Sequence, residues 1–177
     1  MSNNGEKQIN SYLTFMLADE TFASHVNFVL KILEMQKITE VPKAPEFMKG
    51  VINLRGNVLP IIDARLKFGM KQTAYTEKTC ILVLSIEIDK DKVEVGAIVD
   101  AVLDVIEYQK ENIKPAPSLG SKYKTDFIEG VMKLDNNFVM VLNMDAAFST
   151  EDIIHLPNKT ENPETENKEQ DSDIIQK

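Results

Sequence analysis

Short apolar runs separated by turn-forming residues recur along most of this 177-residue chain, and they limit its possible folds more than any other feature. Turn signals return about every 8 to 12 residues, which is typical of small all-β barrels. The pattern predicts about nine short strands and very few helices. That number is about enough for two small five-stranded barrels, so we expect an all-β chain of that kind.

Three stretches have a clear strand–turn–strand pattern. They lie at 12–26, around Asp19-Glu20; at 79–100, around "DKDK"; and at 127–144, around "DNN". A further strand is expected at 101–108 and a short helix at 145–156. Residues Val29, Ile32 and Leu33 are instead spaced three and four apart, which predicts about two turns of helix over 27–35.

The stretch "KGVINLRGNVLPIID" at 49–63 is the most patterned in the chain. Two β-rich runs flank Arg-Gly-Asn, which predicts a hairpin with Arg55 at its tip, because Gly56 can adopt a positive φ. Pro60 has no N–H and must lie at a sheet edge or a bulge. A helical turn at 64–69 is expected to follow and to stop at Gly69. Arg55 is then either a solvated turn residue or a contact point for a partner.

The domain organisation follows from these elements. We expect a flexible segment at 1–11 and one domain at 12–155, with a first barrel over about 12–70 and a second over about 79–150. Strands can exchange between the two barrels. From 156 to 177 the chain is nearly free of apolar residues and carries six carboxylates against three lysines, so we expect a disordered acidic tail.

Composition narrows the class of partner and compartment. The net charge is −8, so the chain gains nothing from the counterion release that drives nucleic-acid binding, and an anionic membrane is an equally poor partner. A single cysteine, Cys80, permits no internal disulfide, which fits a reducing compartment. No apolar run approaches the roughly 20 residues of a membrane span, and no secretory signal is evident. We expect a cytoplasmic protein.

The residues that usually carry chemistry do not form a recognisable set. His25 and His155 are far apart, with no cysteine or carboxylate at ligand spacing, so neither predicts a metal site. Cys80 lies in an apolar run, and carboxylates near strand ends are most simply caps or surface groups. We therefore expect a binding module without catalytic, metal or cofactor sites. A small hydrolase or ligand-binding barrel is the alternative class.

The hairpin stretch and its flanks resemble one known family. "APEFMKGVINLRGNVLPIIDARLKFG" closely resembles the signature region of the CheW family of chemotaxis coupling proteins. "YLTFMLADETFA", "ITEVPKAPEF", "VGAIVDAVLDVIEY", "NIKPAPSLG" and "FIEGVMKLDNNFVMVLNMDAAF" are similar to its other segments, in the right order. The resemblance covers about residues 12–150.

The resemblance implies a fold and a function. The fold would be two five-stranded SH3-like β-barrels packed on a shared core. The function would be a non-enzymatic adaptor, without cofactors, that couples methyl-accepting chemoreceptors to the regulatory domain of the histidine kinase CheA. We expect a monomer in isolation that assembles into rings or arrays at membrane receptors. A CheW-like scaffold in pilus-based or developmental signalling is the alternative.

The resemblance also implies site residues. Val29 and Ile32 match apolar positions of the receptor-binding groove between the barrels, while Gly50, Asn53 and Arg55 fall in the signature. Packing of a short helix is the alternative role for Val29 and Ile32, and close backbone approach is the alternative for Gly50. The kinase-binding surface is expected mainly at the edge of the second barrel.

The sequence departs from the family in two places. Lys31 stands where an acidic residue is common, and residues 24–26 lack the usual Ile-Asp-like pair. A receptor contact that depends on that acidic residue would be altered or lost. The acidic tail after residue 156 has no counterpart in the family core.

Overall fold

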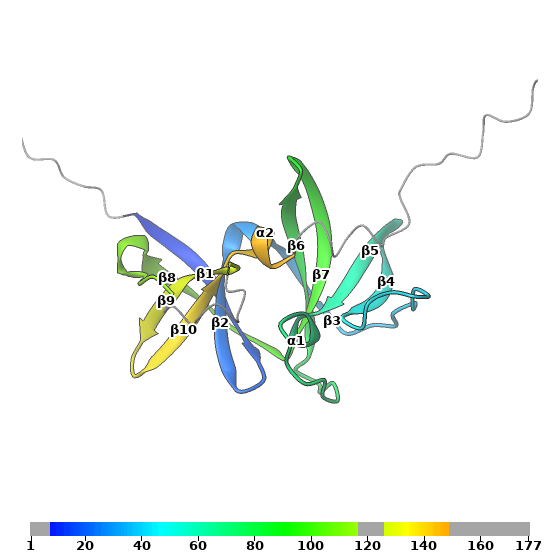
Figure 1. The fold of residues 1–177 in the computed structure, drawn as a ribbon, viewed down its shortest axis with the longest axis horizontal. Coiled ribbons are helices and arrows are strands. Elements are labelled where there is room, and N and C mark those ends of the chain that lie inside the picture. The colour runs from blue at the N-terminus through cyan, green and yellow to red at the C-terminus, as the bar shows by residue number, and fades with distance from the viewer. Residues whose placement is uncertain (1–7, 117–125, 149–177) are drawn as a thin grey trace, which may run out of the picture.

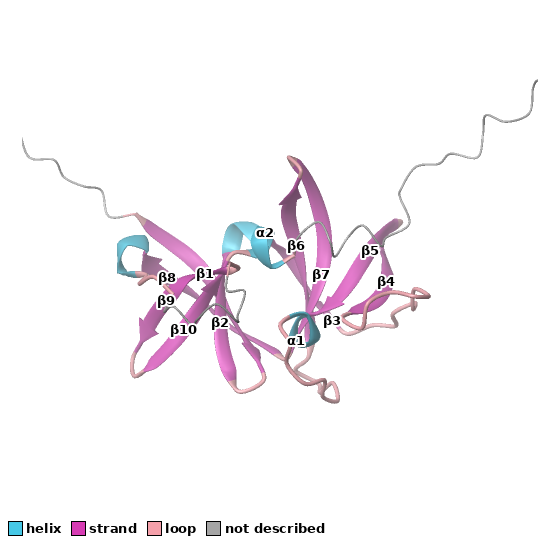
Figure 2. Ribbon diagram, viewed as in Figure 1, coloured by secondary structure: helices cyan, strands magenta, loops and turns pink. Residues whose placement is uncertain are grey.

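The computed structural model describes residues 8–116 and 126–148. These residues form ten strands, two four-residue α-helices and two 3₁₀ turns (Figure 1). The described chain is therefore all-β with few helical residues, as predicted (Figure 2). The elements are β1 (Ile9–Leu17), β2 (Glu20–His25), η1 (Val26–Phe28), β3 (Val29–Glu34), β4 (Met48–Leu54), β5 (Asn57–Asp63), α1 (Ala64–Lys67), β6 (Cys80–Ile88), β7 (Asp91–Val99), β8 (Ala101–Gln109), η2 (Lys110–Asn112), β9 (Ile128–Leu134), β10 (Asn137–Leu142) and α2 (Met144–Ala147).

The strands form two five-stranded sheets with the same connectivity. Sheet A has the order β8-β1-β2-β10-β9, and sheet B has the order β3-β6-β7-β5-β4. In each, the third and fourth strands pair in parallel and the other neighbours pair antiparallel. Figure 1 shows the two sheets side by side, with α2 drawn between them.

The sheets do not divide the chain into an N-terminal and a C-terminal half. Strands β1 and β2 share sheet A with β8, β9 and β10, whereas β3, β4 and β5 share sheet B with β6 and β7. The expected barrel segments, 12–70 and 79–150, therefore do not correspond to the sheets, and the exchange of strands that we allowed for is extensive. Strand pairing between distant segments depends on three-dimensional packing, which the run pattern does not encode.

An isolated backbone bridge joins the two edges of each sheet. In sheet B, Thr39 follows the edge strand β3 and pairs with Val51 of the other edge strand, β4, through two N–H···O bonds of 2.9 Å. In sheet A, Lys114 follows β8 and pairs with Val131 of β9, with bonds of 3.0 and 2.8 Å. Both sheets are thus closed in the same way, as expected of small barrels.

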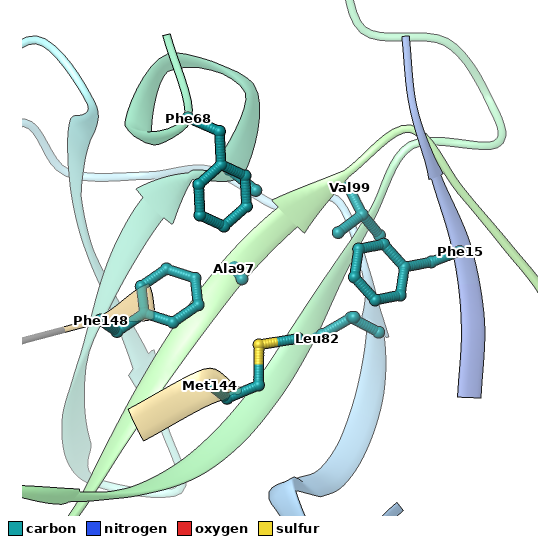
Figure 3. Close-up of a pocket in the computed structure, with 8 residues that line it drawn as sticks. Phe15, Phe68, Leu82, Ala97, Val99, Met144 and Phe148 are labelled. Atoms are coloured by element: carbon teal, nitrogen blue, oxygen red, sulfur yellow. The ribbon is translucent and has the colours of Figure 1, made fainter. Parts of the chain in front are cut away.

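Three clusters of buried side chains form the core. One, which includes Tyr12 and Met132, lies in sheet A, and another, which includes Ile52 and Ile81, lies in sheet B. The largest draws on both sheets and on α2, and its fully buried members include Phe15, Leu82 and Phe148. Figure 3 shows Phe15, Met144 and Phe148 converging on Leu82 and Ala97. The predicted shared core is therefore present.

The helix predicted over 27–35 is wrong. Only η1 is helical, and β3 follows as an edge strand paired with β6. Residues Val29, Lys31 and Leu33 are half-buried and alternate with exposed Leu30, Ile32 and Glu34, which is the period of a strand. The spacing of three and four that suggested a helix arises because apolar residues lie on both faces of β3. Pairing with β6 then overrides the local pattern.

The other predicted elements are largely present. The hairpins at 12–26, 49–63, 79–100 and 127–144 correspond to β1–β2, β4–β5, β6–β7 and β9–β10, and α1 ends before Gly69, which has φ 76°. Strand β1 begins at Ile9, inside the segment expected to be flexible. Of the helix expected at 145–156, the described residues show only α2. The acidic tail at 156–177 lies outside them.

Pro60 lies within the sheet but at a position that needs no N–H. It faces Val51, whose N–H and C=O both bond to Thr39, on the side away from β5. The Val51–Pro60 pair is therefore a non-hydrogen-bonded one, and the Pro60 nitrogen points away from β4. On that other side, pairing with β7 begins only at Ile61. Pro60 thus occupies a position where no strand partner needs its missing N–H, although β5 is not an edge strand.

Candidate protein-binding surfaces

The tip of the β4–β5 hairpin is a tight two-residue turn. Leu54 pairs with Asn57, and the intervening Arg55 and Gly56 have φ values of 51° and 82°. Two successive positive φ values define a type I′ turn, whose twist matches that of the strands. The Asn53 side-chain oxygen accepts a 2.8 Å bond from the Gly56 N–H and orders the turn.

Arg55 adopts a backbone conformation that its side chain disfavours. A left-handed conformation costs about 1–2 kcal/mol for a non-glycine residue. The side chain is exposed, and its guanidinium forms no hydrogen bond or ion pair within the part of the chain that the structure describes. An arginine held at such a position, with its donors free, is suited to contact with another molecule.

Gly50 has a structural role that accounts for its identity. Its φ is 140°, and a Cβ at this position would overlap the carbonyl oxygen of Thr39. The overlap follows directly from the Thr39–Val51 bridge, which brings the two backbones together. Gly130 is its counterpart in sheet A, where a Cβ would lie 2.6 Å from the Lys114 carbonyl oxygen. The structure therefore accounts for Gly50 by the alternative role, which is close backbone approach.

Edge strand β3 exposes apolar side chains beside the shared core. Ile32 is 48% exposed and lies opposite Leu82, so both share the sheet face that packs on the other barrel. Val29 is half-buried and packs against the shared core itself. A bulge follows Val29 and adds Leu30 to the strand without a partner, so that Leu30 is 49% exposed.

Edge strand β8 repeats this arrangement on sheet A. Val105 is 61% exposed and lies opposite Leu13, which belongs to the shared core. A bulge at Leu103 and Asp104 faces Thr14. The Thr14 hydroxyl donates to the Asp104 carbonyl oxygen at 2.9 Å and accepts from its N–H at 3.1 Å, which fixes the bulge and leaves Leu103 exposed. Equivalent edge strands therefore extend the shared core into solvent.

The predicted site residues do not form one compact cluster. Val29 and Ile32 lie on β3 beside the shared core, whereas Asn53 and Arg55 lie at the tip of the β4–β5 hairpin. The two groups are connected, because Leu33 and Met35 near the end of β3 pack against the same apolar cluster as Leu54. Together they extend along one barrel from the shared core to the hairpin tip.

A second surface lies on sheet A, where a pocket of about 730 Å³ opens beside the β9–β10 hairpin. Phe138 and Met140 of β10 both line it, and Phe138 is 69% exposed. Lys114 and Lys133 also line it, and the Tyr108 hydroxyl accepts a long bond from the Lys133 N–H. The pocket is mainly apolar and its described lining adds two lysines and one glutamate, which suits a protein segment more than a charged small molecule.

The groups that usually perform chemistry have structural partners. His25 Nδ1 accepts a 3.1 Å bond from the Asn27 N–H, which caps η1, and the ring packs edge-on against Tyr12. Burial raises the pKa of the Cys80 thiol, which keeps it protonated at neutral pH. Residue His155 lies outside the described residues, within which no group of three or more metal-ligating side chains occurs. The arrangement of these groups favours a binding function over a catalytic one.

A polar cross-link connects the barrels near this core. The Asp100 carboxylate follows β7 and accepts from Arg65 Nε, at 2.8 Å, and from the Ala18 N–H, at 2.6 Å. It also forms a salt bridge with Arg65 Nη2, and its hydrogen bond is the main cause that raises the pKa of Arg65. Helix α1 is thereby tied to the β1–β2 turn of sheet A.

Comparison with known proteins identifies the family. Residues 11–152 match the model of the CheW-like domain. The chain belongs to the CheW family.

Relatives within the CheW family cover most of the chain. The chemotaxis protein CheW of Klebsiella aerogenes is 31% identical over 87% of this chain and 90% of its own length. The chemotaxis protein CheW of Bacillus subtilis is 34% identical over 83% of this chain and 89% of its own. The crystal structure of a scaffolding protein CheW from Thermoanaerobacter tengcongensis superimposes with a TM-score of 0.70 at 31% identity, over 80% of this chain and 93% of that one.

The CheW family assignment confirms the predicted class of function. The protein is a non-enzymatic adaptor of chemotaxis signalling with two SH3-like barrels. These relatives do not favour the alternative of a scaffold for pilus-based or developmental signalling. The described chain contains no helix long and apolar enough to cross a membrane.

Sequence reasoning missed several residues of these surfaces. Leu30, Leu103 and Val105 look like ordinary strand residues until strand pairing shows which face they occupy. The Phe138 pocket was also missed, although a signal for it exists. "GVINL" at 50–54 and "GVMKL" at 130–134 both start with Gly-Val and end in Leu, 80 residues apart, so Phe138 is the counterpart of Val58. The two hairpins occupy equivalent places in the sheets.

Proposed function

We propose that the protein bridges the cytoplasmic tip of a chemoreceptor and the regulatory domain of a CheA-type histidine kinase, with a separate surface for each partner. The observation that carries this proposal is the pair of exposed apolar edge strands, β3 and β8, on either side of one shared core. Clusters of exposed apolar side chains mark surfaces that bind another protein, whereas single scattered ones do not.

The receptor surface is proposed to combine β3 with the hairpin tip. Ile32 and Val29 would give apolar contact, and Arg55 would donate paired hydrogen bonds to a carboxylate or carbonyl group of the receptor. Asn53 would act by holding the turn, through its bond to the Gly56 N–H. Leu103 and Val105 of β8 would form the opposite wall of this surface. Gly50 would contribute only through the backbone bridge that it permits.

At Lys31, β3 departs from the pattern that the family resemblance implies. It is half-buried on β3, between the exposed Leu30 and Ile32. The resemblance implies an acidic residue at this position, whereas this chain has an ammonium group, so a receptor group that contacts Lys31 is expected to be acidic or neutral.

The kinase surface is proposed to lie on sheet A, around the Phe138 pocket. A partner could fill the pocket with an apolar side chain and place acidic groups against Lys114 and Lys133. Because the hairpins with Arg55 and Asp135 occupy equivalent places on the two barrels, similar barrel-to-barrel contacts could also repeat and close into rings or arrays. In isolation the protein is expected to be a cytoplasmic monomer that joins arrays through the receptor.

The test is reconstitution of kinase control on receptor-containing membranes. We expect kinase activity to depend on the added protein, and Arg55→Glu to lose the receptor while still retaining the kinase. Lys90→Glu is the matched control, because Lys90 is also a cation in a tight turn, with φ 71°, at the tip of β6–β7. Equal kinase activity with and without the protein would refute the coupling. Equal receptor binding by the two variants would refute the role of Arg55.

A further inference from the structure

The Phe138 pocket is also suited to a segment of this chain itself. Its lining is mostly apolar, from Ile128 and Val131 of β9 and from Phe138 and Met140 of β10. Its described lining includes Lys114 and Lys133 against Glu20 and is therefore net basic, whereas residues 1–160 together carry 18 basic against 22 acidic side chains, a net charge of −4. An acidic segment is repelled by most of this surface and attracted here.

The C-terminal segment 161–177 has the complementary pattern. Its sequence, "ENPETENKEQDSDIIQK", carries six carboxylates against two lysines. Its two apolar residues, Ile174 and Ile175, directly follow Asp173. An apolar pair next to carboxylates matches an apolar pocket next to ammonium groups. The segment 117–125, which adjoins the pocket in sequence, instead carries two lysines and no carboxylate, so its charge is unfavourable there.

The chain length permits the contact. Phe148, the last described residue, is ten residues from Phe138, a separation of at most about 36 Å along the chain. The residues from 149 to 173 can extend over roughly 80 Å, which is ample for return to the pocket. A tethered segment has an effective concentration of about millimolar, so even weak intrinsic affinity populates the docked state.

The described pocket has no competing ion pair. Among the described residues, a salt bridge joins Arg65 to Asp100, and neither Lys114 nor Lys133 has a carboxylate partner within that part of the chain. Both lysines are exposed and can accept one from elsewhere. We propose that segment 161–177 docks into the Phe138 pocket of its own chain, with Ile174 and Ile175 in the pocket and its carboxylates against Lys114 and Lys133.

Docking would make the tail a competitive regulator of the proposed kinase surface, and this consequence rests on that proposed function. The kinase would bind only molecules whose pocket is open, so its apparent affinity would fall in proportion to the open fraction. Removal of the tail would then tighten kinase binding by about three- to tenfold. High salt would also release the tail from the pocket, because the contacts between its carboxylates and the lysine ammonium groups are exposed and therefore screened.

The first experiment places a spin label on the tail of the full-length chain. A variant with Cys80→Ser and Gln176→Cys is labelled, and paramagnetic broadening of backbone amides is measured by NMR. We expect broadening at Lys133 and Phe138 but not at their counterparts Asn53 and Val58 on sheet B. Charge reversal of both pocket lysines, Lys114→Glu with Lys133→Glu, is expected to abolish it.

The outcomes separate docking from its alternatives. No selective broadening at the sheet A hairpin would overturn the proposal. Broadening that passes from a labelled chain to an unlabelled, ¹⁵N-enriched chain in a mixture would assign the pocket to a second copy and would also overturn it. Broadening that persists after charge reversal would contradict the role of the two lysines.

The second experiment compares the full chain with one that ends at Leu156, which retains every described element. Binding to the kinase regulatory domain is measured for both. Tighter binding by the shortened chain supports competition, and equal affinity overturns it. If neither chain binds the kinase, the proposed kinase surface is wrong, whereas the spin-label result still decides whether the tail docks.

Discussion

At the scale of single residues, two glycines show how differently the same residue type can be required. Gly50 and Gly56 both have positive φ, at 140° and 82°. Around Gly56 a Cβ would meet nothing within 4 Å, whereas at Gly50 it would overlap the Thr39 backbone. Gly56 is needed only for its backbone conformation, but Gly50 is needed for conformation and space together.

We therefore expect Gly50→Ala to be far more destabilising than Gly56→Ala. The first should lower the free energy of unfolding by about 3 kcal/mol, because the neighbour that must move is backbone rather than a flexible side chain. The second should cost about 1–2 kcal/mol, from backbone strain alone. Urea denaturation of the two variants measures the difference. Similar losses would mean that the Thr39–Val51 bridge opens at little cost.

Arg55 offers a test of whether strain is tolerated for binding. Asn-Gly is the preferred pair for a type I′ turn, so Arg55→Asn should raise the free energy of unfolding by about 0.5–1 kcal/mol. The same change should weaken receptor binding by about tenfold, since the guanidinium is lost. Lys90→Asn should stabilise the β6–β7 turn without affecting the receptor. Unchanged receptor affinity in Arg55→Asn would make Arg55 an ordinary solvated residue.

At the scale of elements, the hairpins were predictable, but the other strands with which each hairpin pairs were not. Turn residues such as Arg55-Gly56 and Asp89-Lys90 act over a few positions, so the sequence pattern locates both strands of each hairpin. The helix predicted over 27–35 failed because the pattern there cannot show that β3 has apolar residues on both faces. The exchange of β1 and β2 into sheet A depends on pairing with residues between 85 and 118 positions away, for which a single sequence gives no signal.

The residues of the candidate site likewise divide into those that the sequence predicts and those that only the fold reveals. The Arg55 tip was predicted because the turn and the family signature are both local in sequence. The exposure of Ile32 beside the shared core becomes visible only when strand pairing places it opposite Leu82. The Phe138 pocket was missed because it combines residues from β8, β9 and β10 with the segment around Lys114. Those residues are brought together only by the fold.

The loop that connects α1 to β6 depends on one buried carboxylate. Asp63 caps α1 by accepting from the Leu66 N–H, and its other oxygen accepts a 3.0 Å bond from the Tyr75 hydroxyl. Burial is the main cause that raises the pKa of Tyr75, and the Asp63 charge and hydrogen bond raise it further. The folded state therefore holds the Tyr75 proton more tightly than the unfolded chain does.

This difference predicts an alkaline loss of stability that Tyr75→Phe removes. Above the ordinary tyrosine pKa of 10.0, the unfolded chain releases the proton while the folded chain retains it, so the free energy of unfolding falls as pH rises. At pH 8 the free energy of unfolding of the wild type should exceed that of Tyr75→Phe by about 1 kcal/mol, because the variant lacks the hydrogen bond to Asp63. That gap should narrow above pH 10 in urea denaturation. A gap that stays constant up to pH 11 would contradict the argument.

At the scale of the whole molecule, the fold places two equivalent barrels around one core. Their connectivity, edge bulges and closing bridges correspond, yet their hairpin tips carry opposite charges, Arg55 on sheet B and Asp135 on sheet A. The Asp100 carboxylate and the shared core hold the barrels in a fixed relation. A molecule with two different faces on one rigid body can hold two different partners at a defined distance.

If coupling requires both faces on one molecule, defects on the two faces cannot complement each other. Arg55→Glu should lose the receptor and Phe138→Ser the kinase, and each substitution is at an exposed position that should cost little stability. An equal mixture of the two variants should then fail to restore receptor control of the kinase on reconstituted membranes. Val58→Ser, at the position equivalent to Phe138 on sheet B, should retain kinase binding. Full control by the mixture would show that neighbouring molecules share the two tasks, so the coupling unit would be an assembly rather than a single chain.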